Sequence, residues 1–181
     1  MFSFGNRGMA GNKVEYFELP ELITLGEFGG DFTAYLEAVY EIFRADYIEN
    51  QPVFQGQRLA LKKHPVSQDK EATFWHMTSS GESEEERNPD LRRMERIRWS
   101  PKMINESEHP YLKVWRNIRP GGQKSILIWH DAEKFLVVLR DRGEYILPWT
   151  TYVVNQPHRE RKLMKEYKDY IASKKAETAQ S

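Results

Sequence analysis

Four short segments rich in β-branched, aromatic and apolar residues follow one another in the second half of the chain. The segments span 112–116, 125–130, 135–139 and 145–154, with turn residues between them at 120–122, 131–134 and 141–143. Connections this short join antiparallel neighbours, because a parallel pair needs a crossover of a dozen or more residues. The sequence therefore predicts a four-stranded antiparallel meander.

Two of these segments have a predicted place in the sheet. Residues 126–129 are apolar on both alternating faces, which indicates a central strand with helices covering at least one side. Pro148 has no N–H to donate, so the last strand is expected to be an edge or to be kinked there. Thr150 and Tyr152 are two positions apart and are predicted to share one face of that strand.

Helical spacing is clearest over residues 32–43, where apolar side chains recur at i, i+3, i+4 and i+7 behind a capping Asp31. A second helix is predicted from Asp90 through Arg98, and a basic helix from His158 to Ile171. Residues 14–19 and 58–63 are predicted strands. Residues 73–77 fit either a strand or a helical turn.

These elements predict an α+β fold, with N-terminal helices packed on a four- to five-stranded antiparallel meander and a C-terminal helix closing it. A length of 181 residues suits one domain with its own core. We expect that domain over 14–172, preceded by a mobile arm at 1–13 and followed by a polar tail at 173–181.

Composition excludes several function classes. Lys plus Arg and Asp plus Glu both total 27, so bulk positive charge cannot hold nucleic acid and any such site must be a local patch. The chain has no cysteine, and its five histidines lack metal-ligand spacing, which predicts no metal and no cofactor. The longest apolar run, 135–139, is far below the roughly 18 residues of a membrane span. We expect a cytoplasmic protein without a membrane partner.

His76 is the most interesting histidine, since it stands between Trp75 and Met77 and is followed by three hydroxyl residues. An imidazole can take and return a proton near neutral pH, as transfer from a ribose 2′-hydroxyl requires. A partly buried histidine bonded to backbone explains the same residue.

Arginines crowd the predicted helix after Asp90. Arg92, Arg93 and Arg96 lie about one turn apart there, so their planar guanidinium groups can converge on one phosphate. A solvated helical face paired with nearby acids is the alternative.

Hydroxyl and lysine side chains complete the candidate site. Thr150 and Tyr152 can hold a phosphate or orient a ribose, although β-propensity explains them equally well. Lys63 and Lys70 flank the His76 segment and are weaker candidates for phosphate contact.

Three motifs in order, residues 70–79, 90–99 and 149–152, resemble phage-encoded nuclease-like proteins of the barnase, EndoU, colicin and RelE superfamily. The resemblance spans about residues 58–170. It implies a RelE- or barnase-like fold and metal-independent cleavage of RNA through a 2′,3′-cyclic phosphate. It also implies His76 as general acid or base, Arg93 and Arg96 as stabilisers of phosphorane charge, and a hydroxyl from Thr150. Thr151 departs from the small residue expected there.

Together these observations predict a toxin-like endoribonuclease that acts on tRNA, mRNA or ribosome-bound RNA, with an antitoxin or immunity protein as a further partner. The catalytic residues would be His76, Arg93, Arg96 and Thr150, and the substrate-binding residues Lys63, Lys70, Arg92 and Tyr152. Two alternatives stay open. One is a non-catalytic RNA- or protein-binding module on the same scaffold, and the other is a phage structural or accessory protein with solvated charges.

Overall fold

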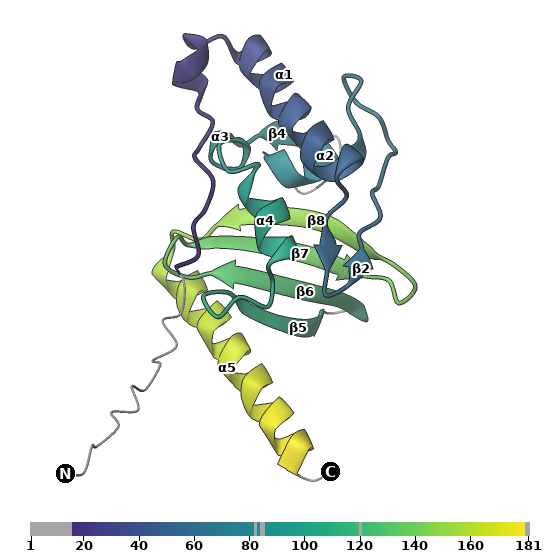
Figure 1. Cartoon of the computed structure of the whole chain (residues 1–181), viewed down its shortest axis with the longest axis vertical. Helices are drawn as coiled ribbons and strands as arrows, with labels where there is room; N and C mark the ends of the chain where they lie inside the picture. Colours follow the sequence, from purple (N-terminus) through teal and green to yellow (C-terminus); the bar gives the residue numbers. More distant parts are fainter. Residues whose placement is uncertain (1–15, 82, 84–85, 120, 180–181) are drawn as a thin grey trace, which may run out of the picture.

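The four β-rich segments form one antiparallel sheet in the order β5-β6-β7-β8 (Figure 1). This is a computed structural model, and it describes residues 16–179 apart from 82, 84–85 and 120. The strands are β5 (Lys113–Arg119), β6 (Gln123–His130), β7 (Phe135–Asp141) and β8 (Ile146–Val153). Helices precede the sheet and one helix follows it, so the predicted α+β layout is confirmed.

The other elements have at most 7 residues, except for the helices α1 and α5. They are η1 (Leu25–Phe28), α1 (Phe32–Phe43), η2 (Arg44–Glu49), β1 (Val53–Phe54), β2 (Gln57–Arg58), α2 (Ala72–Thr78), β3 (Ser79–Ser80), β4 (Asn88–Pro89), α3 (Leu91–Met94), α4 (Trp99–Asn105) and α5 (Pro157–Ala179). Asp31 caps α1 as predicted, because its carboxylate accepts from the backbone N–H groups of Thr33 and Ala34.

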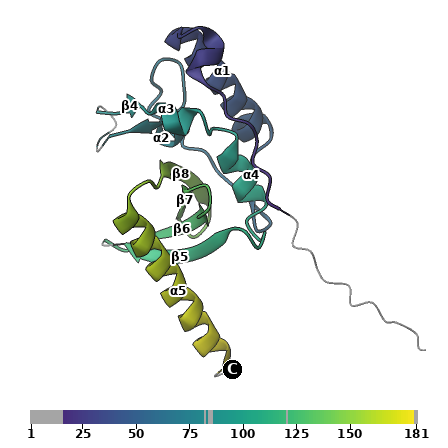
Figure 2. The same ribbon diagram turned by 90° about the vertical axis from the view of Figure 1, so that its left-hand side faces the viewer.

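One face of the sheet builds the main core. Ile126, Ile128, Val137 and Leu139 lie on this face, since each residue pairs with another of the four across β6 and β7. They pack in one cluster with buried side chains of the N-terminal helices, among them Val39, Phe43, Phe74, Met103 and Ile104. Figure 2 shows these helices and α5 on different sides of the sheet.

The opposite face is covered by α5 over only part of its area. Leu127, Trp129, Leu136 and Val138 pack there against one side of α5, which contributes Leu163, Met164, Tyr167 and Tyr170. Central β6 is therefore covered on both faces, where the apolar run 126–129 predicted helices on at least one side. The rest of this face carries polar side chains, namely Arg119, Ser125, Arg140 and Thr150, with Tyr152 opposite Leu136.

A bulge interrupts the edge strand at Pro148. Leu139 pairs with Pro148 and Val138 with Thr150, so Trp149 has no partner across the ladder. The strand is both an edge and irregular, which confirms the expectation from proline. Beyond the bulge, Thr150 pairs with Val138 and Tyr152 with Leu136. Both partners lie on the α5 face, so Thr150 and Tyr152 lie on that face too.

Several local predictions need correction. The strand expected at 14–19 does not form over its described residues, 16–19. Phe17 packs in the core, but this segment pairs with no other strand. Of the strand predicted at 58–63, only Arg58 pairs with another strand, as the last residue of β2. The ambiguous residues 73–77 are helical, within α2.

Two helix boundaries also differ from the sequence prediction. The helix expected over 90–98 ends at Met94, and a turn separates it from α4. The polar tail expected from Ser173 is helical as far as Ala179. The arm predicted at 1–13 lies outside the described residues.

His130, at the end of β6, gives the fold a pH dependence. The side chain is buried beneath Phe17, and burial lowers the pKa of its imidazole from the ordinary value of 6.5. The unfolded chain then binds a proton near pH 6.5 that the folded chain does not bind. We expect the free energy of unfolding to fall as the pH drops from 7.5 to 5.5.

The expected measurement is a pair of urea titrations at these two pH values for wild type and His130→Phe. The variant loses the hydrogen bond from the Glu133 N–H at both pH values, but it should lose less stability than wild type on acidification. An equal loss in both proteins would show that His130 does not carry the effect.

Candidate functional site

A groove of about 740 Å³ lies beside the bulged strand β8. It is lined by β3, the N-terminal end of α3, β8 and the segment that enters α5. Its lining residues are mostly cationic or hydrogen-bonding: Ser79, Ser80, Gly81, Arg87, Asp90, Arg92, Arg93, Trp149, Thr150, Tyr152, Val153, Asn155, Gln156 and Arg159. Four sequence-predicted site residues therefore meet here, namely Arg92, Arg93, Thr150 and Tyr152.

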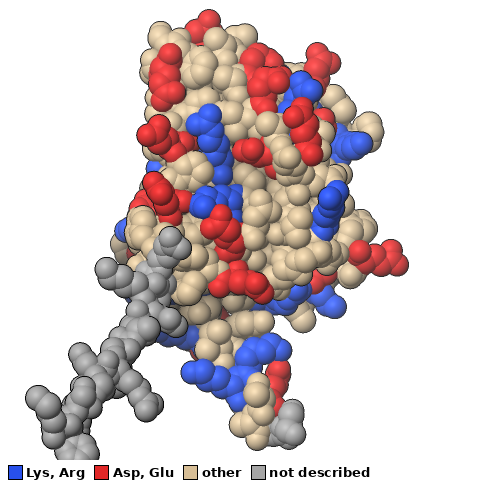
Figure 3. All heavy atoms as spheres, in the orientation of Figure 1, with Lys and Arg blue, Asp and Glu red and all other residues tan. Residues whose placement is uncertain are grey.

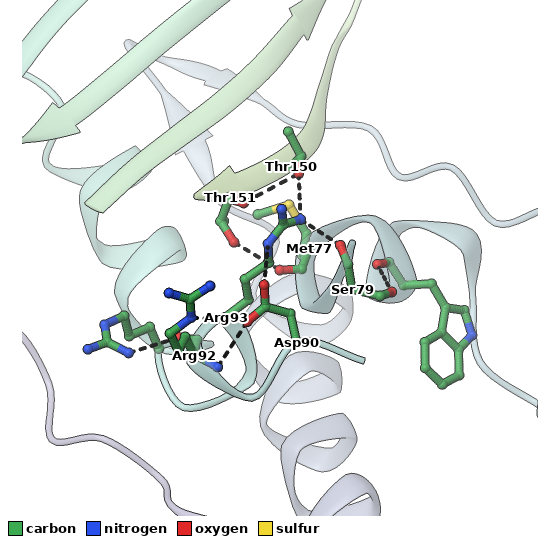
Figure 4. A network of polar contacts seen from close by, with 9 residues as sticks. Met77, Ser79, Asp90, Arg92, Arg93, Thr150 and Thr151 are labelled. Carbon is green, nitrogen blue, oxygen red and sulfur yellow. Dashed lines mark hydrogen bonds and ion pairs between the residues drawn. The ribbon is translucent and has the colours of Figure 1, made fainter. Parts of the chain in front are cut away.

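Arg93 is buried at the base of the groove and connects three elements (Figure 4). Its Nη1 donates to the Ser79 carbonyl at 2.5 Å and to Thr150 Oγ1 at 3.1 Å. Its Nε lies 3.4 Å from a carboxylate oxygen of Asp90, which also caps α3. The guanidinium stacks over the Tyr152 ring at 4.8 Å. The side chain thus joins β3, α3 and β8.

Burial lowers the pKa of Arg93, and Arg87 and Arg92 lower it further, whereas Asp90 opposes them. Asp90 is the single carboxylate among the described lining residues, against four guanidinium groups. Arg159 makes no ion pair with any described residue, and Arg92 reaches Asp90 only at 3.8 Å. An anion in the groove would place negative charge beside Arg159 and Arg92.

His76 is one layer behind the groove. The side chain is 3% exposed, and its ring packs against Trp149 with centroids 4.6 Å apart. Its Nδ1 lies 3.3 Å from Nη2 of Arg87. Because a guanidinium can only donate, Nδ1 must accept and a neutral ring carries its proton on Nε2. Two lining residues, Trp149 and Arg87, therefore separate His76 from the groove.

Three other predicted site residues lie elsewhere, which corrects their placement. Arg96 does not converge with Arg92 and Arg93, because its Nη1 donates to the Arg92 carbonyl and to Glu95. Lys70 is buried and pairs with Glu37 at 2.6 Å, so its charge is already neutralised. Lys63 is exposed but is not among the lining residues.

The sequence analysis missed other lining residues. Arg87 follows an acidic run, and Arg159 lies near the start of a helix with many basic residues, which is typical of a solvent-exposed face. Nothing in the sequence therefore distinguishes these two arginines from the other surface charges. Asn155 and Gln156 had no signal except their position directly after the last strand. That position was informative, since the end of β8 and the start of α5 border the groove.

Other possible sites give no competing candidate in the described part of the chain. No group of three or more His, Asp or Glu residues there can hold a metal ion. No helix among the same residues is long and apolar enough to cross a membrane.

The comparisons found no family that matches this chain, no curated relative and no similar solved structure.

We predict that Arg93→Ala lowers the free energy of unfolding by about 3 kcal/mol, because it leaves Asp90 and two acceptors without their partner in a buried site. Arg92→Ala, one residue away and exposed, should cost less than about 0.5 kcal/mol. Urea denaturation measures both values. Equal small losses would contradict a structural role for Arg93.

Proposed function

We propose that this groove binds the sugar-phosphate backbone of single-stranded RNA. The observation that carries the proposal is the gathering of Arg87, Arg92, Arg93 and Arg159 around one groove with one described carboxylate. Planar guanidinium groups bind two phosphate oxygens at once and remain charged at neutral pH.

Aromatic and hydroxyl groups support a single strand over a duplex. Tyr152 borders the groove and is 36% exposed, and an exposed aromatic face can stack on an unpaired base. Ser80, Asn155 and Gln156 are exposed there and offer donors and acceptors for ribose 2′-hydroxyls.

Acidic and basic side chains gather on different parts of the surface, so a chain with no net charge can still have a cationic groove. In Figure 3, red acidic side chains are frequent around α1, whereas blue basic side chains gather around α5. Repulsion from the acidic side chains then disfavours binding around α1, and affinity depends on a small number of phosphate contacts.

We predict that Arg159→Ala weakens binding of a fluorescein-labelled single-stranded RNA by roughly three- to tenfold, as expected for one lost phosphate contact. The slope of log Kd against log salt should also decrease by about 0.7. Fluorescence anisotropy at several salt concentrations measures both.

The matched control is Lys63→Ala, which removes one exposed cation outside the groove. It should leave the affinity and the slope unchanged. Equal weakening by both variants would mean that diffuse charge, and not the groove, holds the RNA.

RNA cleavage is the second candidate, because the imidazole of His76 lies one side chain away from the groove, in contact with the lining residue Trp149. The imidazole would accept the 2′-hydroxyl proton as that oxygen attacks the adjacent phosphorus, and the imidazolium so formed would return the proton to the 5′-oxygen as its bond to phosphorus breaks. Arg93 and Arg87 would stabilise the charge on the phosphorane without a metal. Because His76 is 3% exposed, Trp149 must move aside for this reaction.

The test is incubation of single-stranded RNA with wild type, His76→Gln and His64→Gln in EDTA. We expect wild type and His64→Gln to yield 2′,3′-cyclic phosphate ends, while His76→Gln binds RNA but cleaves at least 100-fold more slowly, as for loss of a general acid or base. If wild type leaves the RNA intact, or if His76→Gln cleaves as fast as wild type, the cleavage proposal is wrong. Neither result contradicts the binding proposal.

A further inference from the structure

A second cavity, of about 300 Å³, lies next to the groove, between the sheet and α5. Tyr152, Val153 and Arg159 line both hollows. A chain of nucleotides that leaves the groove past Tyr152 therefore reaches this cavity next.

The cavity has the chemistry of a nucleobase site. Leu136, Val154 and Leu163 give it an apolar lining that suits the face of a flat ring. Arg119, Arg159 and Lys162 also line it, and none of them forms an ion pair with a described residue. The cations can hold the flanking phosphates while the ring lies against the apolar side chains.

Glu166 is the one carboxylate among the described lining residues. Its Oε2 is held in place, since it accepts from Trp115 Nε1 at 3.4 Å and from Asn117 Nδ2 at 3.2 Å. Its Oε1 accepts no hydrogen bond from any described residue. A fixed carboxylate with one unused oxygen accepts hydrogen bonds from a ligand and repels a ligand's carbonyl oxygens.

We infer that this cavity takes one base of the bound RNA strand and that Glu166 makes it prefer a base with an exocyclic amino group over uracil. Cytosine, adenine and guanine each present an amino donor, whereas uracil presents carbonyl oxygens on both sides of its single N–H. The inference rests on the proposed RNA binding and adds base selectivity to it.

Cytosine and uracil give the sharpest comparison, because the two rings are equal in size and differ at N3 and at the exocyclic 4-substituent. The probes are fluorescein-labelled octamers of 2′-O-methylcytidine and 2′-O-methyluridine, which cannot undergo attack by a 2′-hydroxyl. We expect wild type to bind the cytosine octamer roughly tenfold more tightly, a ratio that corresponds to about 1.4 kcal/mol.

Glu166→Gln should bring this ratio close to one, because an amide can donate to uracil as well as accept from cytosine. The matched control is Asp169→Asn, which makes the same change from acid to amide on the same helix at an exposed position. It should keep the wild-type ratio, although both variants gain some affinity for any anion.

The two proposals fail in different ways. Equal binding of both octamers by wild type would overturn the base selectivity and leave RNA binding intact, and this arm needs no variant that must fold. An unchanged ratio in a folded Glu166→Gln would also overturn the role of Glu166. Absence of binding to both octamers and to the unmodified single-stranded RNA would overturn the RNA-binding proposal and the inference with it, whereas binding of the unmodified RNA alone would overturn only the inference.

Discussion

The buried guanidinium of Arg93 is the interaction on which the site depends. It joins the N-terminal layer to the edge strand, through the Ser79 carbonyl, Asp90 and Thr150. An unpaired charge in this position would be costly, so the bonds fix the relative placement of α3 and β8. The same bonds keep a cation at the base of the groove and the Tyr152 ring beneath it.

The edge position of β8 explains why the site forms there. A central strand has neighbours on both sides, whereas β8 has a free edge against which α2 and α3 can pack. The bulge at Trp149 turns one indole out of the ladder, between His76 on one side and Arg140 on the other. Proline removes a ladder donor at the preceding residue, which is why the irregularity occurs at this point.

Periodicity and turn spacing were enough to predict the sheet, the first helix and the last helix. They also placed Thr150 and Tyr152 correctly on one face, since alternation along a strand depends only on local geometry. The helix after Asp90 was predicted too long, because charge spacing along 91–98 does not show where tertiary packing bends the chain.

The candidate site was predictable only in part. Arg92 and Arg93 border the groove near Thr150, as expected from residue type, but Lys70 pairs with a glutamate 33 positions earlier. That partner belongs to α1, and no local pattern connects the two segments. Arg87 and Arg159 could not be assigned to the groove from the sequence either. Only folding brings the loop before β4 and the start of α5 together.

The most direct test of the central claim is photocrosslinking to a single-stranded RNA that carries 4-thiouridine at every third position, with the crosslinked peptides identified by mass spectrometry. RNA bound in the groove should crosslink to Trp149, Tyr152 and the peptide that contains Arg159. Crosslinks confined to α1 or to the C-terminal half of α5, with none along β8, would contradict the account.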